Sequence, residues 1–190
     1  MRIAVIGTGH VGGTLGGRWR AAGHDVRYGS RSGSGAGPGG APVQPVADAL
    51  ADAEVVLLAV PGGAVGEVIT ANAAALGGKV VIDAVNRMGE PEVNSQAAIA
   101  AAAPTAQYVR AFNTLGWDNF ADPPDGAELF YAADPAAREV AEELIWAVGL
   151  GPQFVGGPDA ANTVDGVVRL WFSLVQQHGG DRKLAFRVVR

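Results

Sequence analysis

Residues 3–12 read IAVIGTGHVG, and this stretch decides the fold. The apolar residues 3–6 predict a short buried strand, and residues 11–22 predict the helix that follows it. The pattern G-x-G-x-x-G lies between them, at residues 7–12. In that position, after a strand and at the start of a helix, the pattern is typical of a turn that binds the phosphates of a dinucleotide.

Each glycine of the pattern has a separate role in such a turn. Gly7 permits the tight bend, Gly9 lets the backbone approach a pyrophosphate, and Gly12 lets the helix pack closely on the strand. The phosphates would rest on N–H groups at the start of the helix. A glycine-rich turn without a ligand fits this context less well. We therefore expect the cofactor phosphates beside six consecutive residues: Gly7, Thr8, Gly9, His10, Val11 and Gly12.

The remainder of the chain continues the alternation of strands and helices. Further strands are expected at residues 26–28, 55–60, 80–82, 108–112, 129–132 and 153–155, and helices at 46–50, 64–75, 96–103, 135–148 and 162–178. The segment 32–40, SGSGAGPGG, is poor in side chains and predicts a surface loop. The alternation predicts a doubly wound, mostly parallel α/β sheet of the Rossmann type.

The C-terminal part predicts a helical extension to this sheet. Apolar residues of the helix at 162–178 occur on more than one side, so the helix is either deeply buried or packed against a second subunit. We expect a dinucleotide-binding domain over 1–157. Residues 158–190 would complete the cleft and form the interface of a homodimer.

The end of the second expected strand indicates which dinucleotide binds. NAD sites usually carry Asp or Glu there, to bond the ribose 2′-hydroxyl. This chain has Ser30 and Arg31 instead, and Asp25 lies at the other end of the strand. Ser30 can donate a hydrogen bond to a 2′-phosphate and Arg31 can pair with its charge. NADP is therefore favoured over NAD, although Arg31 could also be a solvated loop residue.

Further site candidates follow the other strands, because the carboxyl ends of parallel strands meet in one crevice. We expect Val60 and Pro61 to lie beside the cofactor. Asn86, Asn113 and Thr114 offer uncharged hydrogen bonds to the nicotinamide or to its reaction partner.

The sequence shows no convincing catalytic side chain and no metal site, so none is predicted. Asp83 is interpreted as a structural turn residue and Trp117 as a core aromatic rather than a cover for a flat ring. His24 and His178 are interpreted as structural, and His10 as a residue that the phosphate loop brings near the cofactor. Hydride transfer between two cofactors requires little more from a protein than binding and alignment.

Composition limits the remaining classes of function. The chain has 190 residues, a formal net charge of −5 and no cysteine. The absence of cysteine excludes disulfides and cysteine nucleophiles. The negative net charge disfavours a general nucleic-acid binder. No apolar run approaches the length that spans a bilayer. We expect a soluble cytoplasmic protein of one domain that binds neither nucleic acid nor membrane.

Several motifs in order resemble one known family. GTGHVGGTLGGRW (7–19), GHDVRYGSR (23–31), VVLLAVPGGAVGEVI (55–69), VVIDAVN (80–86), VRAFNTLGWDNFADP (109–123) and the closing DGVVRLWFSLVQQHGGDRKLAFRVVR (165–190) are similar to the NADPH-dependent deazaflavin (coenzyme F420) reductase family. The resemblance implies a hydride shuttle between NADP(H) and coenzyme F420.

The same resemblance implies roles for individual residues. Phosphate-binding roles carry over to Thr8, Gly9 and His10, and the 2′-phosphate roles to Ser30 and Arg31. The sequence departs from the family at two places. Small residues replace a basic residue after Arg31, and Asn113 stands where some members have a histidine near the deazaflavin.

The C-terminal segment 169–190 is basic within an acidic chain. It contains five basic residues and one acidic residue, Asp181. The basic residues are Arg169, Arg182, Lys183, Arg187 and Arg190. Their charge could hold the phosphodiester and glutamyl tail of an anionic deazaflavin, or it could simply be solvated.

Two other functions remain open at this stage. An NADPH-dependent reductase of a small carbonyl, imine or flavin would usually need a proton donor in the cleft. A domain that senses NADPH without turnover would need none.

Overall fold

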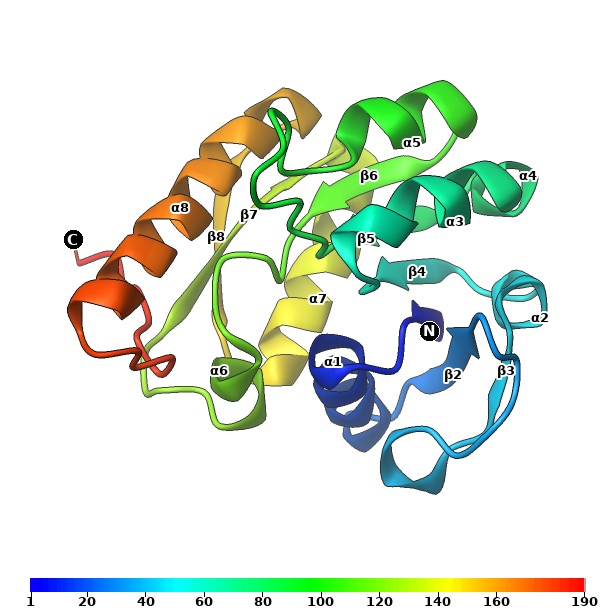
Figure 1. Cartoon of the computed structure of the whole chain (residues 1–190), viewed down its shortest axis with the longest axis horizontal. Helices are drawn as coiled ribbons and strands as arrows, with labels where there is room; N and C mark the ends of the chain where they lie inside the picture. The colour runs from blue at the N-terminus through cyan, green and yellow to red at the C-terminus, as the bar shows by residue number, and fades with distance from the viewer. Residues whose placement is uncertain (190) are drawn as a thin grey trace.

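The computed structural model describes residues 1–189 and contains one sheet of eight strands in the order β3-β2-β1-β4-β5-β6-β7-β8 (Figure 1). The strands are β1 (Arg2–Ile6), β2 (Asp25–Ser30), β3 (Val43–Pro45), β4 (Val55–Leu58), β5 (Val80–Asp83), β6 (Gln107–Arg110), β7 (Glu128–Ala133) and β8 (Gly151–Gly156). The first six pair in parallel. The doubly wound, mostly parallel sheet is therefore confirmed.

Helices connect the strands across both faces of this sheet (Figure 1). They are α1 (His10–Ala21), α2 (Val46–Leu50), α3 (Val65–Ala71), α4 (Ala73–Leu76), α5 (Gln96–Ala102), α6 (Trp117–Ala121), α7 (Arg138–Val148) and α8 (Ala161–Gln177). Four short 3₁₀ turns, η1 (Pro38–Gly40), η2 (Gly62–Ala64), η3 (Pro135–Ala137) and η4 (Pro158–Ala160), precede a strand or a helix. None of the helices in residues 1–189 is long and apolar enough to cross a membrane.

The structure differs from the sequence-based expectation in the shortest elements and in strand direction. β3 and α6 were not expected. A strand of three residues is too short for a periodic signal, and the five residues of α6 have no counterpart among the helices predicted from the sequence. β7 runs antiparallel to β6, and β8 is parallel to β7. The segment 32–40 is not featureless: it contains η1 and an isolated bridge between Ala36 and Pro42.

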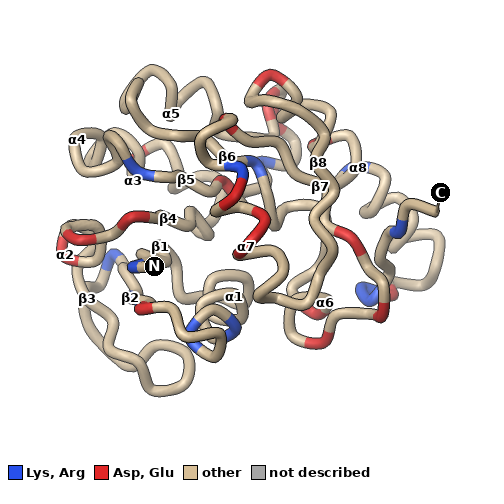
Figure 2. The backbone as a smooth tube through the Cα atoms, turned by 180° about the vertical axis from the view of Figure 1, so that it is seen from behind, with Lys and Arg blue, Asp and Glu red and all other residues tan. Residues whose placement is uncertain are grey.

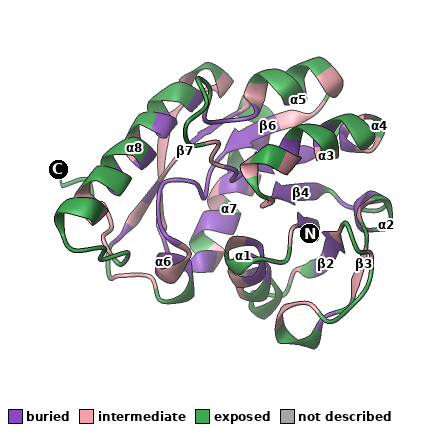
Figure 3. Ribbon diagram, viewed as in Figure 1, coloured by how far each residue is buried: buried purple, intermediate pink, exposed green. Residues whose placement is uncertain are grey.

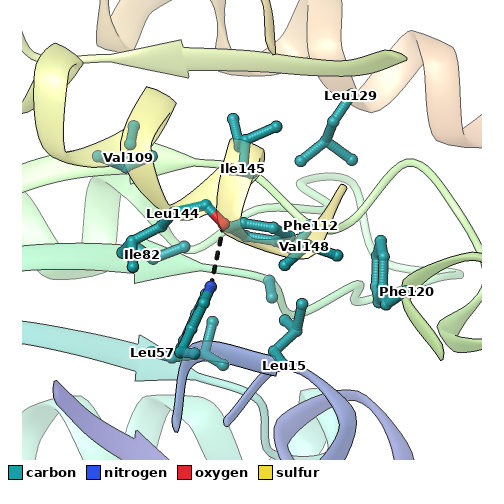
Figure 4. Close-up of a cluster of buried hydrophobic side chains, with 14 of the residues drawn as sticks. Leu15, Leu57, Ile82, Val109, Phe112, Phe120, Leu129, Leu144, Ile145 and Val148 are labelled. Atoms are coloured by element: carbon teal, nitrogen blue, oxygen red, sulfur yellow. Dashed lines mark hydrogen bonds between the residues drawn. The ribbon is translucent and has the colours of Figure 1, made fainter. Parts of the chain in front are cut away.

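Two apolar layers hold the helices to the sheet. Strand residues packed with α1, α6 and α7 form one layer, and those packed with α2, α3, α4 and α5 form the other. Figure 4 shows part of the first layer, in which the indole of Trp19 donates a hydrogen bond of 3.0 Å to the Leu144 carbonyl. Both Trp19 and Leu144 are fully buried. This bond ties α1, which begins at the glycine turn, to α7.

The last helix packs on the same sheet through one side. Val164, Val168 and Trp171 of α8 are buried, whereas Leu170 and Phe172 are 52% and 38% exposed. Figure 3 shows buried and exposed stretches alternating along this helix. The helix follows η4 directly, and no side chain caps its N-terminus.

The segment after α8 folds back along the molecule. The Trp171 indole donates to the Leu184 carbonyl at 2.8 Å, and the Glu128 amide at the start of β7 donates to the Phe186 carbonyl at 2.8 Å. The C-terminal extension thus covers β7 and α6. The domain boundary near residue 157 and the dimer interface remain predictions.

Candidate functional site

The turn between β1 and α1 accepts only glycine at its first position. Gly7 has φ +111°, and its N–H donates to the Gly29 carbonyl of β2 at 3.0 Å. A Cβ on Gly7 would collide with the backbone carbonyl of Ala59, just after β4. Gly7 is therefore wedged between the carboxyl ends of two strands, where the order of the strands reverses and where such sheets bind ligands.

Gly12 and Gly9 have opposite surroundings. A Cβ on Gly12 would collide with the carbonyl of Gly7, so Gly12 holds the helix against the turn. A Cβ on Gly9 would meet no atom within 4 Å. The structure therefore explains Gly12 by packing within the protein. Nothing within the protein requires Gly9.

The start of α1 has no side-chain cap. The N-cap residue is Gly9, which has no side chain that could accept a hydrogen bond from the first turn. The Gly13 N–H donates to the Gly9 carbonyl at 2.8 Å. The first N–H groups of a helix have no acceptor within the helix. Thr8, Gly9 and His10 are exposed around this helix end, so an anion can reach it.

His10 and Trp117 make a stacked ring pair beside the turn. Their ring centroids are 4.6 Å apart and their planes differ by 16°. His10 begins α1 and Trp117 begins α6, so the stack joins the phosphate turn to the loop after β6. Trp117 is half-buried. Its ring packs against the first apolar layer, as expected for a core aromatic, and leaves part of its surface exposed near the turn.

Ser30 and Arg31 follow β2 next to the turn. The Ser30 hydroxyl lies 2.9 Å from the Ser32 hydroxyl and accepts the Gly33 N–H at 3.3 Å. Arg31 is exposed. Because β1 and β2 are parallel and Gly7 is bonded to β2, both residues lie at the same end of the sheet as the glycine turn.

The remaining candidates lie at this end too, since β4, β5 and β6 continue the parallel pairing. Val60 and Pro61 follow β4, Asn86 follows β5, and Asn113 and Thr114 follow β6. The structure therefore brings all the candidate residues to one edge of the sheet.

A buried arginine that the sequence did not single out organises this edge. Arg110, fully buried at the end of β6, pairs with Asp165 of α8 at 2.6 Å. It also donates to the carbonyls of Asp83 at 2.9 Å and Val85 at 2.7 Å, and to Oδ1 of Asn86 at 2.8 Å. Asp165, near the start of α8, is thus the buried partner of Arg110.

Asp83 has the structural role that the sequence suggested. Its carboxylate accepts the Val85 N–H at 3.1 Å, the Ser95 N–H at 2.6 Å and the Tyr108 hydroxyl at 3.2 Å. Burial, together with the negative charge of Asp83, raises the pKa of Tyr108 well above its usual value. The phenol therefore stays protonated and acts as a donor to Asp83.

The loop after β6 combines an unusual backbone with unpaired polar atoms. Phe112 is fully buried and has φ +60°, which is rare for a bulky residue and is found mainly at functional sites. The next two residues are Asn113 and Thr114. Their side-chain oxygens, Oδ1 and Oγ1, are buried without a hydrogen-bond partner among the described residues.

A depression of about 570 Å³ opens between η2 and the loop after β5. Its lining includes Gly62, Gly63, Asn86, Arg87 and Ser95. The guanidinium of Arg87 already has partners within the protein. It donates to the Asn94 carbonyl at 2.5 Å, and its Nη2 lies 3.7 Å from Oε2 of Glu92.

Part of the positive charge of the C-terminal segment is neutralised by α6 and the residue after it. Arg182 pairs with Asp118 at 3.1 Å and Lys183 with Asp122 at 2.7 Å. In Figure 2 basic and acidic residues lie close together where this segment passes α6. The Lys183 ammonium holds the pKa of Asp122 below its usual value. These two cations therefore hold the segment against α6. Arg190 lies outside the described residues.

Comparisons with known proteins agree with this geometry. Residues 2–87, from the first strand to the loop after β5, match the family described as NADP oxidoreductase coenzyme F420-dependent. The matched segment is less than half of the chain, and it contains the glycine turn, Ser30 and Arg31, and Asn86. Comparison with curated protein sequences returns no match.

Solved structures extend the similarity over the rest of the chain. A protein of Arthrobacter sp. FB24, assigned by name to the F420-dependent NADP reductases, is 25% identical, with a TM-score of 0.85 over 100% of both chains. The hypothetical protein SMa0349 of Sinorhizobium meliloti is 28% identical, with a TM-score of 0.72 over 85% of this chain and 87% of that one.

A more distant structure shares the fold alone. The reductive aminase of Aspergillus terreus, solved with NADPH and ethyl-5-oxohexanoate, is 18% identical. Its TM-score is 0.72, over 94% of this chain and 62% of that chain.

Proposed function

We propose that this protein transfers hydride between NADP(H) and a deazaflavin of the coenzyme F420 type. The open space over Gly9 carries the proposal. Packing within the protein excludes side chains at Gly7 and Gly12, whereas a side chain at Gly9 would meet no protein atom. A cofactor phosphate in that space explains why the position is glycine. The family of residues 2–87 and the Arthrobacter neighbour support the same chemistry.

The residues present fit NADP(H). The uncapped N-terminus of α1 offers N–H groups and a partial positive charge to the diphosphate. Ser30 and Arg31 offer a hydroxyl and a guanidinium to the 2′-phosphate. The end of β2 carries no Asp or Glu of the kind found in NAD sites, so no carboxylate there repels the 2′-phosphate. The full proposed contact set is Gly7, Thr8, Gly9, His10, Val11, Gly12, Ser30, Arg31, Val60, Pro61, Asn86, Asn113 and Thr114.

The chemistry itself would come from the two bound rings, with a hydride passing from the dihydropyridine to the deazaflavin or back. The chain would supply alignment and exclusion of water. Val60 and Pro61 would form one wall of the cleft, and the His10–Trp117 stack another. The buried Arg110–Asp165 pair fixes the loops after β5 and β6 that lie between them.

Three further expectations belong to this proposal: a homodimer, a cytoplasmic location and a cleft completed by residues 158–190. The paired charges of Arg182 and Lys183 leave Arg169 and Arg187 as the cations of the described segment available to an anionic acceptor.

The test is a direct assay of turnover. The protein is mixed with NADPH and oxidised coenzyme F420, and the loss of visible deazaflavin absorbance is followed. Parallel reactions use FMN, a cyclic imine and a small ketone. Turnover with the deazaflavin supports the proposal. Turnover with another acceptor alone would replace it by the alternative reductase, and NADPH binding with no turnover would replace it by a sensing domain.

A further inference from the structure

The amides at the edge of the site have fixed orientations. An arginine side chain can only donate hydrogen bonds and a carboxylate can only accept them. Each of the five N–H groups of Arg110 has an acceptor. Any asparagine that touches Arg110 must therefore present its oxygen, and any asparagine that touches Asp165 must present its NH₂ group.

Two of the three asparagines in the network are satisfied at both ends. Asn86 accepts from Arg110 through Oδ1 and donates from Nδ2 to the Asn113 carbonyl at 2.9 Å. Asn94 donates from Nδ2 to Asp165 at 2.7 Å and accepts the Gln96 N–H through Oδ1 at 3.0 Å. Neither amide can rotate by 180° without opposing two donors or two acceptors.

The third asparagine, Asn113, has an amide oxygen without a hydrogen-bond partner among the described residues. Asn113 is 2% exposed and directs Nδ2 toward Oδ1 of Asp165, at 3.4 Å. Its own Oδ1 then has no partner among residues 1–189, and the hydroxyl of Thr114 beside it has none either. Leaving a buried acceptor without a partner costs about 1–3 kcal/mol. Both oxygens lie beneath the protein surface, so a ligand group that becomes their partner must displace the protein atoms over them.

We propose that Arg110 and Asp165 are positioning residues that hold Asn113 with its amide oxygen unpaired, so that Asn113 and Thr114 bind the amide edge of a ligand. An amide edge is an N–H donor beside a carbonyl acceptor. Asn113 accepts the N–H and the Thr114 hydroxyl donates to the carbonyl. This inference deepens the proposed function and rests on it for the choice of ligands.

Both ligands of the proposed reaction contain such an edge. The nicotinamide ring has a carboxamide, and the pyrimidine ring of a deazaflavin has N3–H next to a carbonyl. The Phe112 backbone, at φ +60°, turns the chain immediately before Asn113. This unfavourable conformation would be retained because it sets the two side chains in place.

Two ligand pairs test the inference, each differing only in the N–H group. The first pair is NADP⁺ and its 3-acetylpyridine analogue, in which a methyl ketone replaces the carboxamide. The second is 5-deazariboflavin and its N3-methyl derivative. Calorimetry measures the four dissociation constants. The wild type should prefer the N–H member of one pair by about tenfold or more, as expected when a buried acceptor loses its partner.

Variants assign that preference to the network. Asn113→Leu should abolish the preference, whereas the matched control Asn72→Leu, at the junction of α3 and α4, should keep it. The double variant Arg110→Met with Asp165→Leu removes the two orienting charges together, so that neither is left buried without its partner. It also leaves the carbonyls of Asp83 and Val85 without their donor, so its thermal unfolding temperature should fall. Titrated below that temperature, in its folded state, it should lose the preference.

The calorimetric results distinguish the two possible ligands from each other and from failure of the inference. A preference in the first pair identifies the nicotinamide as the ligand at Asn113, and one in the second pair identifies the deazaflavin. No preference in either pair, or a preference that survives in the folded double variant, overturns the inference. If NADPH binds but neither pair shows a preference for its N–H member, the proposed function stands and only the inference fails. If NADP(H) does not bind at all, the proposed function fails, and the deazaflavin pair alone decides the inference.

Discussion

Gly9→Ala separates the folding of the glycine turn from its function. Gly9 has φ −71° and ψ −171°, which alanine adopts without strain, and a Cβ there meets no atom within 4 Å. An alanine at a compatible glycine position raises the free energy of unfolding by about 0.4–1 kcal/mol, whereas at the N-cap of a helix glycine is preferred to alanine. Because the two effects oppose each other, the free energy of unfolding of the variant should stay within about 1 kcal/mol of the wild-type value.

The same methyl group should impair binding, because it would occupy the space that we assign to the diphosphate. Displacing a charged phosphate oxygen from one backbone N–H costs about 1.5–3 kcal/mol. Since 1.4 kcal/mol corresponds to a factor of ten, the dissociation constant for NADPH should rise about 10- to 150-fold. The affinity for NADPH should thus fall strongly while the free energy of unfolding stays close to that of the wild type.

Urea unfolding and calorimetric titration with NADPH measure the two effects. Gly17→Ala is the matched control, because Gly17 lies within α1 and a Cβ there also meets no atom within 4 Å. It should stabilise the helix by up to about 1 kcal/mol and leave NADPH affinity unchanged. Gly12→Ala should instead unfold readily, since its Cβ collides with the Gly7 carbonyl. Unchanged NADPH affinity in a folded Gly9→Ala variant would refute the placement of the diphosphate.

Three further changes test other parts of the site and fold. Arg31→Ala should weaken NADPH by about 10- to 150-fold and NADH little, which titration of both dinucleotides checks; an equal loss would mean that the 2′-phosphate lies elsewhere. Burial and the Met1 ammonium lower the pKa of His24, so the unfolded state binds more protons and stability should fall as the pH drops below about 6.5. His24→Gln should flatten that dependence in urea unfolding at pH 7.5 and 5.5, and an unaltered slope would exclude His24 as its source. Arg110→Met alone leaves Asp165 buried without its partner and should lower the free energy of unfolding by about 3–5 kcal/mol; a loss below 1 kcal/mol would contradict the buried pair.

Local sequence patterns predicted the glycine turn and the central strands because their determinants are close together. Gly7, Gly9 and Gly12 lie within six residues, and the apolar run 55–58 is continuous because both faces of β4 are buried. The reversed direction of β7 has no such local signal, since the pairing of β6 with β7 is decided by contacts distant in the chain.

The buried polar network shows the same limit. Arg110 and Asp165 are 55 residues apart, and each looks ordinary in its own segment: one ends a strand, the other lies early in a helix. Only the fold brings α8 over the end of β6. A single arginine at the end of an otherwise apolar strand was the one available signal, because a buried guanidinium requires several acceptors.

The C-terminal cations give a contrasting case. Their number was readable from the sequence, but their partners were not, because Asp118 and Asp122 are more than sixty residues away. Counting charges therefore predicted more free positive charge than the structure leaves.

Titration of the wild-type protein with NADPH and with NADH, in the same buffer, tests the assignment of the turn and of the residues after β2 most directly. We predict that NADPH binds about tenfold or more tightly than NADH, through the hydroxyl of Ser30 and the guanidinium of Arg31. Equal affinity for the two dinucleotides, or binding of neither, would contradict it.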